Sequence, residues 1–135
     1  MFRKKIPLDG VGNDMALPWL GQFIYVTVEP STLTVIDAEH MKTTHQITVG
    51  ASPHHLLVQP DGKYIWVGND GDASVSVIAT DTHKLVATIP VGHGHHELAV
   101  TKGSRYVAVT NQDDNTVTVI SVRNLAPVGT VAVGK

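Results

Sequence analysis

The sequence repeats itself every 42 residues. The pair Val49-Gly50 returns as Val91-Gly92 and again as Val133-Gly134. A repeat of about 40 residues is typical of solenoids, arrays and β-propellers. Each copy holds four short apolar runs with an alternating pattern, separated by glycine, proline, asparagine and aspartate, which indicates strands and tight turns. Four strands per repeat predict one blade of a β-propeller.

The repeat divides the chain into three predicted blades of four strands each, so the expected fold is an all-β segment of a β-propeller. Blade 1 covers residues 13–49, blade 2 covers 54–91 and blade 3 covers 96–133. Residues 3–8 align with the outer strand of a blade and are expected to form a lone outer strand. We expect all 135 residues to form one propeller domain or part of one.

Three blades are too few for a closed ring, because closed propellers contain roughly four to eight blades. The two ends would expose apolar blade faces and unpaired strand edges. The chain is therefore expected to be either a segment of a longer propeller or a protomer that completes the ring by self-association with another copy.

Short motifs in the strands and turns resemble the YVTN family of β-propeller repeats. They are Tyr25-Val26-Thr27-Val28, Trp66-Val67-Gly68-Asn69 and Ala108-Val109-Thr110-Asn111, together with V-G-x-x-P-H at Val49–His54. The resemblance covers nearly the whole chain. It implies a seven-bladed ring and an exported protein, located in the periplasm or on the cell surface. Related propellers hold haem or handle metals, which implies a site in the central channel.

Charge and composition exclude several classes of function. The formal net charge of −2 provides no basic surface for nucleic acid, so DNA and RNA are not expected partners. The chain has no cysteine, which excludes thiolate metal sites and a cysteine nucleophile. No apolar run approaches the ~20 residues of a membrane-spanning helix, and no secretion signal is visible in this chain.

Histidines gather in the two loops that lead into blades 2 and 3. The candidate metal-site residues are His54, His55, His93, His95, His96 and Glu97. The first strand of a blade lies innermost in a propeller, so both loops are expected at one mouth of the central channel. Imidazole and carboxylate ligands together suit zinc, copper, iron or nickel. The pattern predicts a site for zinc, copper or haem iron.

The same histidines also have a structural interpretation. A histidine after this proline is common in the family repeat, so His54 and His96 would bond the backbone of a neighbouring blade through their ring nitrogens. Three further histidines, His40, His45 and His83, lie in or near turns at the outer rim and are expected to face solvent.

Motifs of known catalytic and calcium sites are incomplete in this sequence. His96–Val100 begins like a metalloprotease HExxH motif, but Val100 replaces the second histidine. Asp70-Gly71-Asp72 lacks the spacing of a calcium-binding loop and predicts a turn. We therefore expect a non-enzymatic binding or scaffold module that presents its loops and channel mouth to a protein partner or a small ligand. The alternative is a metal- or haem-binding propeller that handles metal or forms part of a redox enzyme.

Overall fold

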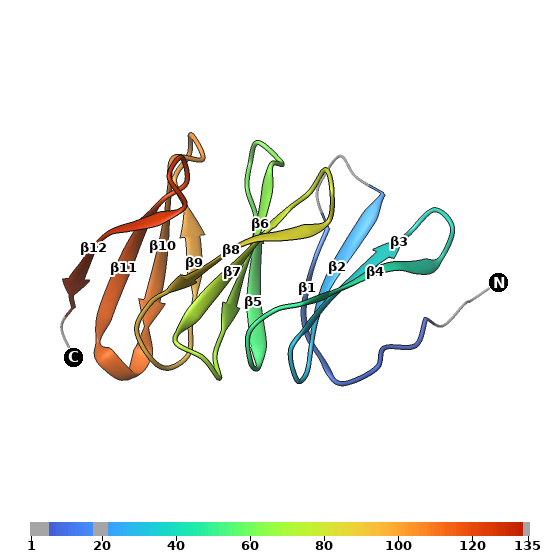
Figure 1. Cartoon of the computed structure of the whole chain (residues 1–135), viewed down its shortest axis with the longest axis horizontal. Coiled ribbons are helices and arrows are strands. Elements are labelled where there is room, and N and C mark those ends of the chain that lie inside the picture. Colours follow the sequence, from blue (N-terminus) through green and yellow to red (C-terminus); the bar gives the residue numbers. More distant parts are fainter. Residues whose placement is uncertain (1–5, 18–21, 134–135) are drawn as a thin grey trace.

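The computed structural model describes residues 6–17 and 22–133 and folds them into three four-stranded antiparallel sheets (Figure 1). The strands of each sheet follow one another in chain order, so each sheet is a meander closed by short turns. The three sheets stand side by side as propeller blades. This confirms the predicted all-β fold of three four-stranded propeller blades.

The strand bounds follow the repeat. Blade 1 consists of β1 (Gly12–Ala16), β2 (Phe23–Val28), β3 (Thr32–Asp37) and β4 (Lys42–Thr48). Blade 2 consists of β5 (Pro53–Val58), β6 (Tyr64–Asn69), β7 (Ser74–Ala79) and β8 (Lys84–Pro90). Blade 3 consists of β9 (Leu98–Val100), β10 (Tyr106–Asn111), β11 (Thr116–Ser121) and β12 (Ala126–Ala132), with a short 3-10 helix η1 (Gln112–Asp114) between β10 and β11. No helix in the described ranges is long and apolar enough to cross a membrane.

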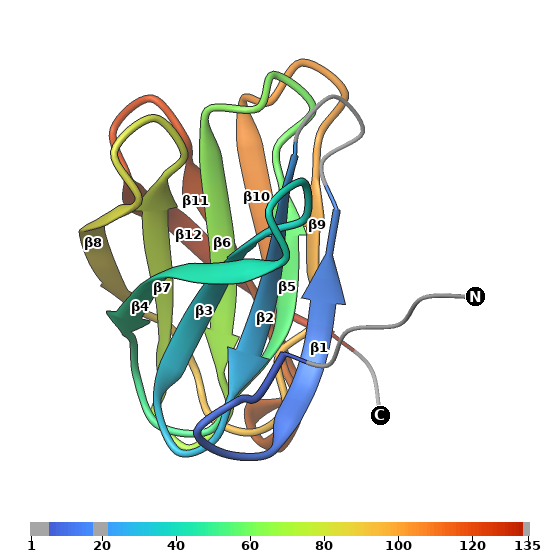
Figure 2. The ribbon, with the colours of Figure 1, turned by 90° about the vertical axis from the view of Figure 1, so that its right-hand side faces the viewer.

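The first strands of the blades lie next to one another along one side of the molecule. Strands β1, β5 and β9 form this side, and the last strands β4, β8 and β12 lie along the opposite side (Figure 2). In a propeller, the innermost strands surround the central channel. The connections that enter β5 and β9 both lie at the same end of the blades (Figure 1). The fold therefore places the histidine-bearing loops together at one end of the inner strands, which in a closed propeller borders the channel.

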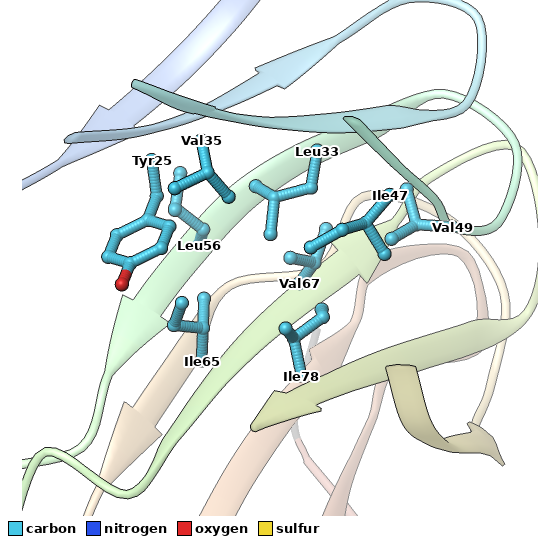
Figure 3. Packing of buried hydrophobic residues seen from close by; sticks show 9 residues of the cluster. All are labelled: Tyr25, Leu33, Val35, Ile47, Val49, Leu56, Ile65, Val67 and Ile78. Atoms are coloured by element: carbon cyan, nitrogen blue, oxygen red, sulfur yellow. The ribbon is translucent and has the colours of Figure 1, made fainter. Parts of the chain in front are cut away.

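Apolar side chains of facing sheets hold neighbouring blades together (Figure 3). Leu33 and Val35 are two residues apart on β3 and fully buried, and Ile65 and Val67 on β6 join the same cluster from blade 2. Side chains two residues apart lie on one face of a strand, so the alternating pattern of the sequence gives each blade an apolar face. Full burial of each such side chain contributes about 1.5–3 kcal/mol relative to exposure. A second cluster, around Trp66, joins blades 2 and 3.

The expected lone outer strand is not formed by the part of it that the structure describes. Residues 6–8 adopt no strand, and residues 3–5 lie outside the described residues. Ile6 and Leu8 instead pack against Val26 and Val28 on the open face of blade 1. The physical reason is that a strand needs a partner for its backbone hydrogen bonds, and the blade to which this segment would belong has no other strand among the described residues.

His83 is buried, contrary to the expectation that it faces solvent. Its Nε2 lies 3.2 Å from the hydroxyl of Tyr25 in blade 1, and its ring meets the edge of Phe23 with centroids 4.9 Å apart. Burial lowers the pKa of His83, and the neighbouring His45 lowers it further. His83 therefore packs as a neutral side chain between blades 1 and 2. His40 and His45 are exposed, as expected.

Candidate ligand site at the channel-side loops

Each histidine-bearing loop is held by a carboxylate of the preceding blade. Glu29 follows β2, and its Oε2 accepts a hydrogen bond from the Ser52 hydroxyl at 2.9 Å. Asp70 follows β6, and its Oδ1 accepts a hydrogen bond from the backbone N–H of His96 at 3.1 Å. Both carboxylates occupy the same place in the repeat, directly after the second strand of their blade. The blade before each loop therefore fixes the position of that loop.

Asp70 also orients the imidazole ring of His95. Asp70 Oδ2 lies 2.7 Å from Nδ1 of His95, and Glu97 Oε1 lies 3.5 Å from its Nε2. The hydrogen bond to Asp70 and the charges of Asp70 and Glu97 outweigh partial burial and raise the pKa of His95. The His95 side chain is 44% exposed. A histidine with one nitrogen fixed by a carboxylate presents the other to a proton or a ligand.

The carboxylate of Glu97 lies between two imidazole rings. Its Oε2 is 3.3 Å from Nδ1 of His55, and its Oε1 faces Nε2 of His95. The His54 ring meets the His95 ring edge-on, with centroids 6.2 Å apart. The structure thus brings four of the six candidate residues together. We call His54, His55, His95 and Glu97, with the supporting Asp70, the histidine cluster.

A recurring hydrogen bond joins each blade to the next beside this cluster. Asp14 on β1 accepts through Oδ2 from the backbone N–H of Leu56 on β5, at 3.3 Å. One blade further on, His55 accepts through Nδ1 from the backbone N–H of Leu98 on β9, at 3.0 Å. Because Nδ1 of His55 accepts this bond, its ring proton lies on Nε2. We call this contact the junction bond.

His96 and His93 do not join the histidine cluster. The His96 ring is fully buried, with Nδ1 3.1 Å from the carbonyl oxygen of Thr110 and Nε2 3.4 Å from that of Asp72. These carbonyl groups belong to blades 3 and 2, so His96 has the contacts that the structural interpretation describes. The His93 side chain is 74% exposed and pairs with Asp114 at 3.2 Å. Hydrogen bonds from the backbone and ring of His93 lower the pKa of Asp114.

Glu29 and Asp70 are site residues that the sequence analysis missed. Asp70 was expected only as part of a turn, and Glu29 was not singled out. A hydrogen bond between consecutive blades leaves no trace in the spacing of one repeat. The usable signal was their shared repeat position, since both follow the second strand directly and precede a histidine-bearing loop by about 25 residues.

The donor groups of the cluster are of the chemical types that metal ions accept. Among the described residues, no three histidine or carboxylate side chains are placed to hold one metal ion. Nε2 of His95 and the carboxylate of Glu97 nevertheless offer adjacent donors, with Asp70 behind the histidine. Hydrogen bonds from Asn13 and Ser52 lower the pKa of Glu29, which adds a further negative charge nearby. The carboxylates of Glu97, Asp70 and Glu29 together give this region a negative charge, which attracts cations.

We expect His95 to titrate above the ordinary histidine pKa of about 6.5, and Asp70→Asn to lower that pKa. Because the folded-state pKa is raised, the pairing stabilises the fold fully below pH ~6.5 and is lost as the pH rises through the pKa of folded His95. A pH titration followed by NMR of the imidazole resonances measures both variants. Glu39→Gln removes a carboxylate remote from His95 and serves as the control. An unchanged His95 pKa in Asp70→Asn would contradict the assignment.

Comparisons with known proteins place the fold. Residues 21–127 match the family described as lactonase, 7-bladed beta-propeller. No protein of curated function matches the sequence. Among solved structures, apo AztD from Citrobacter koseri is similar, with a TM-score of 0.79 and 14% sequence identity. The match covers 98% of this chain and 38% of the AztD chain. The hydrazine synthase of Kuenenia stuttgartiensis has a TM-score of 0.76 and 23% sequence identity, and the match covers 82% of this chain and 32% of the synthase chain. The dihydro-heme d1 dehydrogenase NirN, in complex with DHE, has a TM-score of 0.77 and 19% sequence identity, and the match covers 96% of this chain and 30% of the NirN chain.

These comparisons correct one expectation and refine another. The expectation of a non-enzymatic module is wrong, because the matched family is one of lactonases and the similar structures include a synthase and a dehydrogenase. The resemblance to YVTN repeats is supported as far as the β-propeller fold. The chain spans about a third of the length of the similar solved structures. Since the family match covers most of the sequence, this chain belongs to the seven-bladed β-propeller lactonase family.

Proposed function

We propose that this chain is part of the propeller of an enzyme, and that the histidine cluster supplies part of the coordination shell of a transition metal ion, either free or within a haem. The observation that carries the proposal is the carboxylate of Glu97 between the rings of His55 and His95, 3.3 and 3.5 Å away. Imidazole with carboxylate is a donor set that zinc, copper and iron accept.

The contact between the Asp70 carboxylate and the His95 ring resembles the contact that metal-binding histidines commonly make. Histidine ligands commonly donate their second ring N–H to a carboxylate, which fixes the tautomer and makes the other nitrogen a better donor. Asp70 stands in this position at 2.7 Å from Nδ1, so Nε2 of His95 is the donor atom of the proposal. His55 is less suited, because its Nδ1 already accepts the junction bond and its Nε2 carries the proton.

The remaining donors would come from blades other than these three. A channel site draws on the inner ends of several blades, and this chain spans only about a third of the similar structures. A bound metal would act there as a Lewis acid that polarises a carbonyl, for example that of a lactone, or as a redox centre. The residues of this chain would hold the ion and, through Asp70, keep His95 in the correct tautomer.

We expect zinc or copper ions to bind the 135-residue chain in a calorimetric titration, and His95→Ala and Glu97→Gln to abolish that binding. Asp70→Asn should weaken it by about 10- to 100-fold, because it removes only the support of the ligand. His40→Ala is the matched control, since His40 is exposed in the turn after β3. A parallel titration with hemin, followed by visible absorbance, tests the haem form. Absence of binding by the unmodified chain, or equal binding by the cluster variants, would refute the proposal.

Two further expectations remain predictions. The open faces of blades 1 and 3 are proposed to be covered by further blades, from the remainder of a longer propeller or from a second copy. Val128 and Val131 on β12 are apolar and more than half exposed, which supports such a cover. Export to the periplasm or the cell surface is proposed on the resemblance to exported YVTN propellers.

A further inference from the structure

A groove with an excess of positive charge lies between blades 2 and 3, at the end of the blades opposite the histidine cluster. Its volume is about 560 Å³. We call it the cationic groove, and its chemistry comes from Lys63, Tyr64, Ser104, Arg105, Tyr106 and Arg123. The turns that form it, β5–β6, β9–β10 and β11–β12, lie together at one end of the molecule (Figure 1). Both blades are present in this chain, so the groove does not depend on further blades.

The cations of this groove have no acidic partner. Within residues 6–17 and 22–133, every close contact between a carboxylate and a basic side chain involves a histidine, and none involves a lysine or an arginine. The one carboxylate in the lining, Asp61, already accepts hydrogen bonds from Gln59 Nε2 at 2.9 Å and from the backbone N–H of Lys63 at 3.0 Å. Three cationic side chains thus line the groove against a single engaged carboxylate.

The repeat itself shows that the fold does not require these cations. Arg123 lies in the turn after the third strand of blade 3, and the same position holds Asp81 in blade 2 and Glu39 in blade 1. This turn therefore accepts the opposite charge. Lys63 and Arg105 share another repeat position, where blade 1 has the neutral Gln22. At these two repeat positions, the described residues bring positive charge together at the junction of blades 2 and 3.

The backbone around the groove is fixed by hydrogen bonds. The N–H of Val122 donates to the carbonyl oxygen of Arg105 at 2.9 Å, which holds the two arginine-bearing segments side by side. Ser104 is buried in the left-handed region with φ of 56°, and its hydroxyl accepts from the backbone N–H of Asp61 across the junction, at 3.4 Å. The Arg105 guanidinium lies 5.8 Å from the ring centre of Tyr106. These contacts fix the backbone segments that carry the side chains of the groove.

We propose that the cationic groove binds a small molecule that carries a phosphate or carboxylate group. The planar guanidinium groups of Arg105 and Arg123 match the paired oxygens of such groups, and Lys63 adds a point charge. Tyr64 and Tyr106 offer ring surfaces for the less polar part of the molecule and hydroxyl groups for further hydrogen bonds. This site is separate from the proposed metal site, and neither depends on the other.

We expect sodium pyrophosphate, sodium citrate or both to bind the 135-residue chain in calorimetric titrations at low ionic strength, and added salt to weaken that binding. Binding of pyrophosphate alone identifies a phosphate ligand, and binding of citrate alone identifies a carboxylate ligand. Arg105→Gln and Arg123→Gln should each weaken binding about tenfold or more, because each removes charged hydrogen bonds. Arg123→Asp, which installs the residue that blade 2 carries at this position, should abolish binding while the chain stays folded.

Lys42→Gln and Lys84→Gln are the matched controls, since each removes one positive charge from an exposed strand start outside the groove. They should leave the affinity for the bound probe unchanged. His95→Ala should also leave it unchanged, which keeps this test independent of the metal proposal. The inference is overturned if neither probe binds, or if the control lysines matter as much as the arginines of the groove.

Discussion

Replacement of Trp66 by alanine should lower the free energy of unfolding by about 4 kcal/mol. Trp66 is the largest fully buried side chain of the described residues and stands at the centre of the cluster that joins blades 2 and 3. Its Nε1–H donates to Oε1 of Gln59 at 2.6 Å, so the substitution both opens a cavity and leaves a buried acceptor unpaired. Since domains are stable by only about 5–15 kcal/mol, a loss of this size is a large fraction of the total stability.

Urea denaturation followed by circular dichroism measures this effect. Trp66→Phe keeps most of the volume and should cost about 1–3 kcal/mol, chiefly for the unpaired oxygen of Gln59. Val86→Ala on the exposed side of β8 is the control and should change stability by less than about 0.5 kcal/mol. A Trp66→Ala loss no larger than that of Val86→Ala would show that blades 2 and 3 are not packed as described.

Replacement of His96 by alanine should lower the free energy of unfolding by about 3 kcal/mol. The ring fills the junction of blades 2 and 3 and faces the carbonyl oxygens of Thr110 and Asp72. Alanine would leave a cavity and remove the ring N–H, which donates to one of these two carbonyl oxygens. His96→Asn is the informative partner variant, because blade 1 carries Asn13 at this position and that amide donates to the carbonyl oxygen of Pro53 at 2.8 Å.

We expect His96→Asn to retain at least half of the stability that His96→Ala loses, again in urea denaturation. Zinc or copper affinity, measured on the folded variants, should change little, since His96 lies outside the histidine cluster. The opposite pattern, intact stability with loss of metal binding, would make His96 a ligand and contradict its structural role.

The fold was predictable from the sequence because its determinants are local. Apolar and polar residues alternate along a strand such as β3, and this pattern fixes which face packs inward, as the burial of Leu33 and Val35 shows. The turn residues fix where the strands end. The 42-residue period then sets blade length and strand order. The segment at 6–8 shows the limit of this reasoning, because its sequence matches an outer strand but its strand partner is missing from the described residues.

The candidate site was predictable only in part, because contacts between blades decide it. His95 and His96 are neighbours in sequence, yet one ring reaches the loop surface and the other fills a blade junction, since successive side chains point in opposite directions. The carboxylates that hold the loops come from the preceding blade, about 25 residues earlier. Burial of His83 likewise depends on Tyr25 and Phe23 of another blade, which no local pattern reveals.

The junction bond makes the row of blades directional. In both junctions, a side chain of the earlier blade accepts from a backbone N–H of the later one, from Leu56 to Asp14 and from Leu98 to His55. The two faces of a blade are therefore unlike, and contacts between blades are heterologous, as in a head-to-tail polymer. A second copy of this chain could continue the ring only by placing its first blade after the third. A two-fold symmetric pairing of like ends could not repeat the junction bond, because it would set two faces of the same kind against each other.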